Sequence, residues 1–143
     1  MHKVRIFLCL LSIVSLMSGM GIYLLFRDMS TMLLFARLPK TGFTQTVCIP
    51  LEPSFFSDIL KYNVPDMLWF VSGILLLRFI WFCNNKVQHI YVLCFYGIGF
   101  IVEISQLSEQ VPGTFDLSDL FCMGIGAFVE GLLYTILVKR RLI

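Results

Sequence analysis

Charged residues are scarce in this chain, and they do not form a nucleic-acid-binding surface. Of the 143 residues, 14% are charged, 58% are hydrophobic and 15% are aromatic, and the net charge is only +2. The mean hydropathy of +0.87 is far above that of a soluble domain of this length. Because the basic residues are not interleaved with aromatic residues on one face, we exclude nucleic acid as a partner. The composition indicates a membrane protein.

The sequence also lacks the motifs of common enzymes and metal sites. Its five cysteines are scattered, with no CxxC or Cys/His metal spacing. It has no Ser/His/Asp set, Walker loop or HExxH motif, and its two histidines are His2 and His89. We therefore expect no metal and no cofactor, and we favour a protein that is not an enzyme, although enzymatic activity stays open.

Long apolar runs are what the chain does have. Four of them approach the ~20 residues needed to cross ~30 Å of hydrocarbon as a helix, namely residues 6–26, 66–83, 90–107 and 116–138. The first run is longer than the apolar core of a signal peptide and lacks a convincing cleavage site, so we interpret it as a retained span. The sequence predicts an all-α membrane protein with one domain over residues 1–143, a compact bundle of about four transmembrane helices.

The segment between the first two spans, residues 27–65, is predicted to be a long extracytoplasmic loop. Its stretches 29–38 and 53–62 have apolar residues at helical spacing, which is typical of helices that lie on the membrane surface or cover the top of a bundle. Four prolines are expected to stop any helix from running through the loop: Pro39, Pro50, Pro53 and Pro65.

Basic residues predict the orientation of the bundle. With the N-terminus inside, the inner segments hold Lys3, Arg5, Lys86, Lys139, Arg140 and Arg141. The short outer loop 108–115 holds no basic residue. By the positive-inside rule, both termini are expected to be cytoplasmic.

Small residues recur at places where helices would have to approach one another closely. They are Ser12, Ser15 and Gly19 in the first span, Gly97 in the third, and Gly126, Ala127 and Gly131 in the fourth. Ala127 and Gly131 have the small-xxx-small spacing of membrane helix interfaces. We expect these positions to be helix-packing contacts.

The polar stretch 106–120 lies between the last two spans. Chain direction places five polar side chains at the outer ends of three spans: Asp66, Glu103, Gln106, Asp116 and Asp119. Spacings of three put Glu103 and Gln106 on one helix face, and Asp116 and Asp119 on another. Because ionisable groups in a membrane are costly and usually functional, we predict a shallow acidic pocket in the outer leaflet. The alternative for the three aspartates is helix capping.

Two further charged residues lie inside the predicted spans. Arg78 is about three turns inward from Asp66, and we expect it to snorkel to the cytoplasmic interface, with an ion pair inside the bundle as the alternative. Glu130 lies mid-span with no cation near it in sequence. We expect a neutral carboxyl group bonded to another helix, because burial disfavours the charged form, with a proton relay as the alternative.

At these residues the sequence resembles the VanZ-like integral membrane proteins of bacteria. That family's pattern is a helix ending in Glu-x-x-Gln, a loop with Pro-Gly-Arg, and Asp-x-x-Asp before a Gly-rich helix. Here it reads "EISQLSEQVPGTFDLSDLFCMGIGA", with matches at Glu103, Gln106, Pro112, Gly113, Asp116, Asp119, Gly126 and Ala127, and with Asp66 at the start of the preceding span. The chain departs at Thr114, where the family usually has Arg, and at Met123, where it often has Asn.

The resemblance implies a multi-pass protein of the bacterial cytoplasmic (inner) membrane, related to proteins linked to resistance to the glycopeptide teicoplanin. Our leading hypothesis is a cell-envelope protein whose acidic pocket binds a lipid, a glycolipid or an amphiphilic antibiotic. One alternative is a structural or accessory subunit of an envelope complex, with another membrane protein or a second copy as its partner. The other is a membrane-embedded enzyme that acts on a lipid-linked substrate, with Glu103 and Asp119 as acid and base.

Overall fold

The computed structural model describes residues 2–26, 49, 52–108 and 115–139, and every regular element within them is a helix. The elements are α1 (His2–Phe26), α2 (Phe55–Asp58), the π-helical turn η3 (Ile59–Asn63), α3 (Val64–Ile80), α4 (Asn85–Ser105) and α5 (Leu117–Lys139). Four helices are long and apolar enough to cross a membrane. The prediction of a four-span helical bundle is confirmed to that extent, while stretch 29–38 and Thr114 lie outside the described residues.

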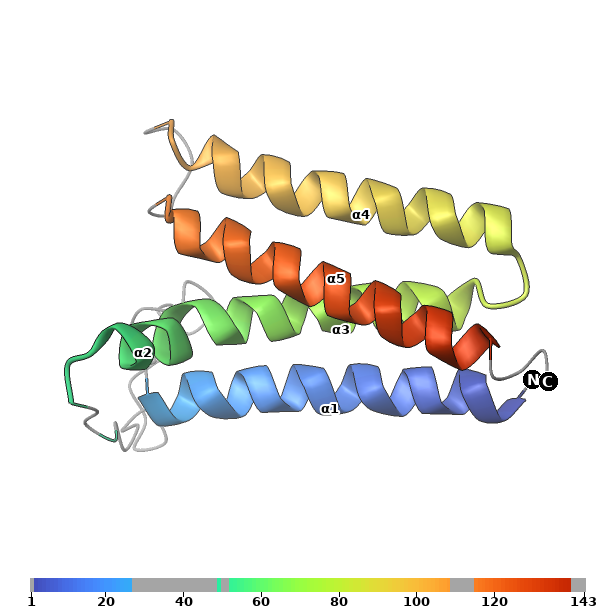
Figure 1. Cartoon of the computed structure of the whole chain (residues 1–143), viewed down its shortest axis with the longest axis horizontal. Coiled ribbons are helices and arrows are strands. Elements are labelled where there is room, and N and C mark those ends of the chain that lie inside the picture. The colour runs from blue at the N-terminus through green and yellow to red at the C-terminus, as the bar shows by residue number, and fades with distance from the viewer. Residues whose placement is uncertain (1, 27–48, 50–51, 109–114, 140–143) are drawn as a thin grey trace, which may run out of the picture.

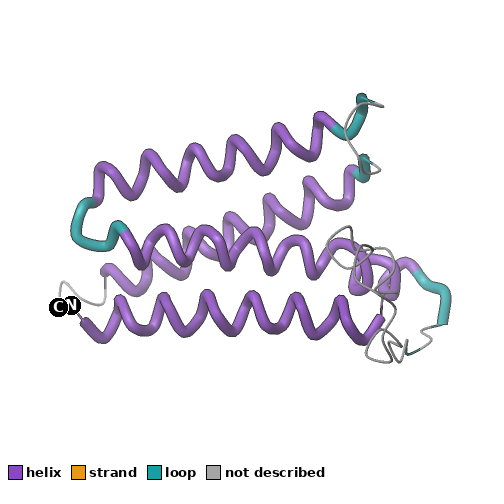
Figure 2. The backbone as a smooth tube through the Cα atoms, turned by 180° about the vertical axis from the view of Figure 1, so that it is seen from behind, coloured by secondary structure: helices purple, strands orange, loops and turns teal. Residues whose placement is uncertain are grey.

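The four long helices run side by side (Figures 1 and 2). α1 packs mainly on α3, α5 also packs on α3, and α4 lies on the side away from α1. The start of α1, the end of α5 and the α3–α4 turn are at one end, which we call the terminal end. The last turn of α1, α2, the last turn of α4 and the first turn of α5 are at the other end, the loop end.

The second span begins eleven residues earlier than predicted, because the helix runs through Pro65. Phe55–Ile80 is one continuous helical stretch that starts at a capping box, in which Ser54 Oγ accepts from the N–H of Ser57 and Ser57 Oγ accepts from the N–H of Ser54. The π-helical turn lies just before Pro65, and there the N–H of Val64 donates to the C=O of Ile59. Pro65 has no N–H to place in an α-helical ladder, and the wider turn absorbs that missing bond.

Small polar residues hold α1 against α3, as predicted. Ser12 Oγ donates to the backbone carbonyl of Ser72 at 2.9 Å, and Ser15 Oγ donates to that of Leu68, also at 2.9 Å. A Cβ atom at Gly19 would lie only 2.7 Å from the indole ring of Trp69. The predicted close approach of the first span to a neighbour is therefore confirmed at all three positions.

The packing prediction holds for only part of the fourth span. A Cβ atom at Gly126 would lie 2.8 Å from side chains of α3, and Ala127 packs against the core. Gly131 and Gly97 make no such contact, because an added Cβ would meet nothing within 4 Å at either position. The structure therefore shows no close approach of a described residue at these two positions, and their role in packing stays a prediction. On α4 the close approach is instead at Gly99, where a Cβ would lie 2.5 Å from Phe70.

An aromatic core fills the middle of the bundle between α3, α4 and α5. Phe70 is at its centre, with the rings of Phe95, Tyr96 and Phe100 at centroid distances of 5.4, 5.9 and 6.3 Å. Met123 is buried in the same core. This apolar layer separates the two ends of the bundle.

Candidate functional site

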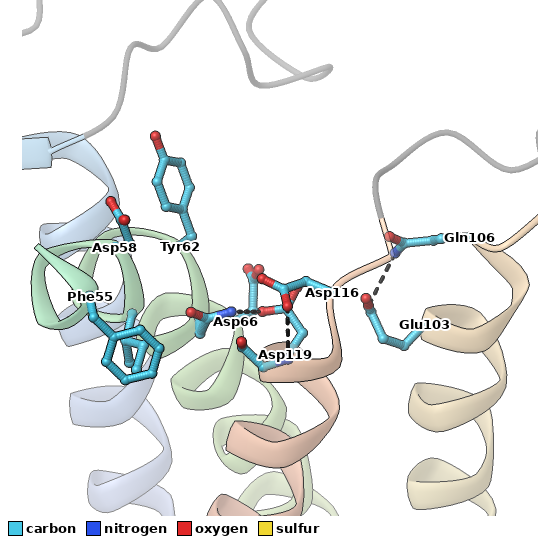
Figure 3. Close-up of a pocket in the computed structure, with 11 residues that line it drawn as sticks. Phe55, Asp58, Tyr62, Asp66, Glu103, Gln106, Asp116 and Asp119 are labelled. Atoms are coloured by element: carbon cyan, nitrogen blue, oxygen red, sulfur yellow. Dashed lines mark hydrogen bonds between the residues drawn. The ribbon is translucent and has the colours of Figure 1, made fainter. Parts of the chain in front are cut away.

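A cavity of about 490 Å³ opens at the loop end, where η3, α3, α4 and α5 meet. We call it the acidic cavity (Figure 3). The structure brings all five sequence-predicted site residues to its wall: Asp66, Glu103, Gln106, Asp116 and Asp119. The other described lining residues are Phe55, Asp58, Ile59, Tyr62, Asn63 and Ser118. Five carboxylates therefore face one space, and no described residue of its wall is basic.

Glu103 is the most deeply buried acid of the cavity, with only 9% of its surface exposed. Its Oε2 accepts a hydrogen bond from Nε2 of Gln106 at 3.1 Å. The backbone N–H of Asp116 faces this carboxylate from the start of α5. Oε1 is nevertheless buried without a partner in hydrogen-bonding geometry among the described residues. A buried oxygen left unpaired costs about 1–3 kcal/mol, so Glu103 can gain from a donor that enters the cavity.

Gln106 positions this carboxylate from the end of the same helix. It is the C-cap residue of α4, and its backbone N–H donates to the C=O of Glu103 at 3.2 Å. The hydrogen bond from the Gln106 side chain to the Glu103 side chain spans the same turn of the helix (Figure 3). Gln106 thus occupies one oxygen of Glu103 and leaves the other for the cavity.

Asp116 caps α5 as well as lining the cavity. Its Oδ1 accepts from the backbone N–H of Ser118 at 2.9 Å, so the capping interpretation of this residue is correct. This bond lowers the pKa of the Asp116 carboxyl group below its usual value, and hydrogen bonds from the Ser118 and Asn63 side chains act in the same direction. The exposed Asp116 side chain therefore stays charged in mildly acidic solution.

Asp119 is tied to a residue that sequence reasoning missed. Asn63 Nδ2 donates to Oδ1 of Asp119 at 2.5 Å, which joins η3 to α5 across the cavity wall. Asn63 is 3% exposed and is the last residue of the π-helical turn. Such turns occur often at functional sites, and the proline two residues later was the available signal for one.

Exposed aromatic side chains adjoin the acidic cavity. Phe55 lines the cavity, and its neighbour Phe56 meets it edge-on with ring centroids 5.9 Å apart. Their exposed fractions are 70% and 81%. Asp66, in the first turn of α3, and Asp58 also line the cavity (Figure 3). The cavity therefore combines negative charge with adjoining exposed apolar surface. Among the described residues, no group of three or more His, Cys, Asp or Glu side chains is placed to hold a metal ion.

A second polar cluster is buried in the bundle and corrects two predictions. Arg78 does not snorkel, because it is 6% exposed and its Nε and Nη2 donate to Glu130 Oε1 and Oε2 at 2.5 and 3.0 Å. Glu130, 1% exposed, has a cationic partner where we expected none. The partners are 52 residues apart in sequence and meet only because α3 packs on α5.

Neighbouring polar groups complete this buried cluster. The hydroxyl of Tyr96 donates to Glu130 Oε2 at 3.3 Å, and the ring of Tyr134 lies 4.0 Å from the guanidinium carbon of Arg78. Gln88 donates to the backbone carbonyl of Arg78 at 2.9 Å and accepts from the Tyr134 hydroxyl at 2.7 Å. The cluster therefore links α3, α4 and α5. Its hydrogen bonds help to compensate the two buried charges, which a buried ion pair requires.

Comparison of the chain with protein-family models, with curated proteins and with solved structures finds no match. No family is therefore identified, and the resemblance to VanZ-like proteins rests on the motif residues alone. The chemistry of the site must be argued from its own geometry.

Proposed function

We propose that this protein binds amphiphiles that carry a cationic, hydrogen-bond-donating head group, and that Glu103 is their main contact. The observation that carries the proposal is the unpaired, buried Oε1 of Glu103 in a cavity with four further carboxylates. An ammonium group brings a positive charge and several N–H donors to such a site. Charge-assisted hydrogen bonds of this kind contribute about 1.5–3 kcal/mol each.

The surroundings of the acidic cavity favour an amphiphile over a small soluble cation. Its volume of about 490 Å³ lies within the range of about 300–1,000 Å³ that is typical of ligand sites. Phe55 and Phe56 offer apolar surface beside the cavity. The cavity is at the end of helices that are long enough to cross a membrane. A head group can therefore enter it while an apolar tail stays in lipid.

A structural role is the second candidate, and a specific contact favours it for one residue. The hydrogen bond between Asn63 and Asp119 joins two helical segments, so replacing Asp119 is expected to loosen the fold as well as the site. Glu103 separates the two functions, because its Oε1 has no partner to lose. A charge-removing variant at Glu103 therefore tests binding with the least effect on packing.

The binding test uses the purified protein in lipid nanodiscs and calorimetric titration with dodecylammonium, with empty nanodiscs as the blank. Glu103→Gln keeps the size of the side chain and removes its charge, so we expect binding at least about tenfold weaker, which corresponds to about 1.4 kcal/mol. Glu52→Gln is the matched control, because Glu52 is exposed and does not line the cavity. Dodecanol, the neutral analogue, should bind both proteins weakly. Equal dodecylammonium affinity of the wild type and Glu103→Gln would refute the proposal.

The envelope role is proposed from the VanZ-like resemblance and the distribution of basic residues. Lys3, Arg5 and Lys86 are at the terminal end, which by the positive-inside rule supports a cytoplasmic terminal end and an acidic cavity in the outer leaflet. The bacterial cytoplasmic membrane is proposed from the resemblance alone. Teicoplanin is then one candidate amphiphile. A host that expresses the wild-type protein should be less susceptible to it than a host with Glu103→Gln at equal membrane abundance. Equal susceptibility of the two hosts would mean that this protein is not linked to the resistance phenotype through Glu103, whatever the outcome of the calorimetry.

A further inference from the structure

A second cavity, of about 380 Å³, lies at the terminal end of the bundle, opposite the acidic cavity. We call it the terminal cavity. Its wall comes from α3, α4 and α5 and includes Arg78, Asn85, His89, Gly131, Tyr134 and Thr135. We propose that the terminal cavity binds the phosphate head group of an anionic membrane lipid, with Arg78 as the cationic contact.

Arg78 has donor capacity left after its ion pair with Glu130. A guanidinium group has five N–H donors on three nitrogens. Glu130 takes one edge through Nε and Nη2, and the ring of Tyr134 covers one face. The third nitrogen, Nη1, makes no hydrogen bond of good geometry to a described residue. The Arg78 side chain is only 8% exposed, so an unused donor of a buried cation is available to the terminal cavity.

The start of α4 adds positive potential at the same place. Asn85 and His89 are one turn apart in the first two turns of this 21-residue helix. The side chain of Asn84 accepts from the N–H of Val87, and the N–H of Gln88 donates to the Asn84 carbonyl. The backbone N–H groups in the first turn of α4 give this end of the helix a partial positive charge, which favours a phosphate group.

Acidic side chains gather at the loop end of the bundle, and most basic side chains gather at the terminal end, where an anion would bind. Among the described residues, the acids lie at the loop end with one exception, Glu130, which is already paired with Arg78. The described cations Lys3, Arg5 and Lys86 lie at the terminal end, while Lys61, in η3, lies at the loop end. The terminal end therefore carries more positive than negative charge among the described residues, which favours an anion at that end.

Exposed apolar side chains on the same helices favour a lipid over free phosphate. Ile90, Leu132 and Ile136 each follow a cavity residue in sequence, and their exposed fractions are 60%, 53% and 44%. They lie on the spans α4 and α5, whose exposed faces are suited to acyl chains. A phosphate in the terminal cavity can thus remain attached to tails that run along these helices. Basic pockets between transmembrane helices are known to recognise anionic lipids in this way.

The test fills the terminal cavity without touching the ion pair. A Cβ atom at Gly131 would meet nothing within 4 Å, so Gly131→Leu can extend into the cavity space. Gly124→Leu is the matched control on the same helix, since it has the same open surroundings and lines neither cavity. Native mass spectrometry of the full-length protein then measures retention of dioleoylphosphatidylglycerol against dioleoylphosphatidylcholine.

We expect the wild type and Gly124→Leu to retain the anionic lipid about tenfold better than the zwitterionic one, and Gly131→Leu to show no preference. Equal retention of the two lipids by the wild type, or an unchanged preference in Gly131→Leu, would overturn the proposal. Displacement of the bound lipid by excess inorganic phosphate would overturn its assignment as a lipid site. If Gly131→Leu does not fold, the exposed Asn85→Ala replaces it, with an expected loss of preference of about fivefold.

Discussion

The buried Arg78–Glu130 pair makes a directional prediction about stability. Glu130→Met leaves a guanidinium group buried at 6% exposure without its counter-ion, and this group cannot lose its proton. Arg78→Met leaves a carboxyl group that can take up a proton and keep its bond with Tyr96. Breaking a buried pair by removing one partner typically costs about 3–5 kcal/mol. We expect Glu130→Met to cost about that much, and Arg78→Met clearly less, about 1–3 kcal/mol.

The double variant Arg78→Met/Glu130→Met completes the cycle. Replacing both partners with apolar side chains removes both buried charges, so its cost should be smaller than that of Glu130→Met alone. The free energy of unfolding is measured for all four proteins in the same detergent micelles. The reasoning would be refuted if the two single changes were equally costly and added up within about 0.5 kcal/mol in the double variant, because uncoupled residues behave in that way.

Three smaller predictions concern packing, the cavity wall and acid sensitivity. Gly19→Ala should lower the free energy of unfolding, measured by thermal unfolding, by about 1–3 kcal/mol, because the added Cβ would lie 2.7 Å from Trp69. Gly21→Ala is the control, because Gly21 has open space around it, and its thermal unfolding should match that of the wild type. Asn63→Leu should cost about 1–3 kcal/mol in the same assay, because the Asp119 carboxylate on α5 loses one hydrogen-bond donor; no loss would mean that the bond is dispensable. The lowered pKa of Asp116 in the fold means that its stabilising effect is present above the unfolded value of about 3.9 and is lost as the pH falls through the folded value. Asp116→Asn keeps a capping side chain, so its melting temperature should fall less on acidification than that of the wild type.

Hydrophobic runs predicted the number and order of the spans, but not where the second one begins. The run that starts at Asp66 is only the inner part of a helix that extends to Phe55. Proline was expected to end the helix because it removes a backbone donor, and it does remove one at Pro65. The π-helical turn at residues 59–63 accommodates that loss. Such a turn depends on backbone bonding around the proline, which composition and periodicity do not encode.

The candidate site, too, was predicted from the sequence only in part. Chain direction and helical spacing placed Glu103, Gln106 and the aspartates at one end of the bundle, and the structure collects them in one cavity. Asn63 was missed because a single polar residue before a proline has no periodic signal. The pairing of Arg78 with Glu130 was not resolved because it depends on how α3 packs against α5. Local sequence therefore reports the end of the bundle at which a residue lies, while contacts between distant helices require the fold.

The two cavities are expected to act independently. Glu103 and His89 lie about four turns apart on α4, roughly 21 Å at about 1.5 Å per residue, with the aromatic core around Phe70 between the two ends. Changes at sites separated by more than about 7–10 Å, with no shared partner, usually have additive effects. Their charges are also opposite, so one head group does not suit both sites.

Crossing the two assays tests this independence. Glu103→Gln should weaken dodecylammonium binding and leave the preference for the anionic lipid unchanged, while Gly131→Leu should do the reverse. If filling the terminal cavity weakened dodecylammonium binding about tenfold, the aromatic core would have to transmit a change between the ends. Phe70, whose ring meets those of Phe95, Tyr96 and Phe100, would then be the first residue to vary. If each variant affected only its own assay, the bundle would be a rigid frame that holds two separate sites of opposite charge preference.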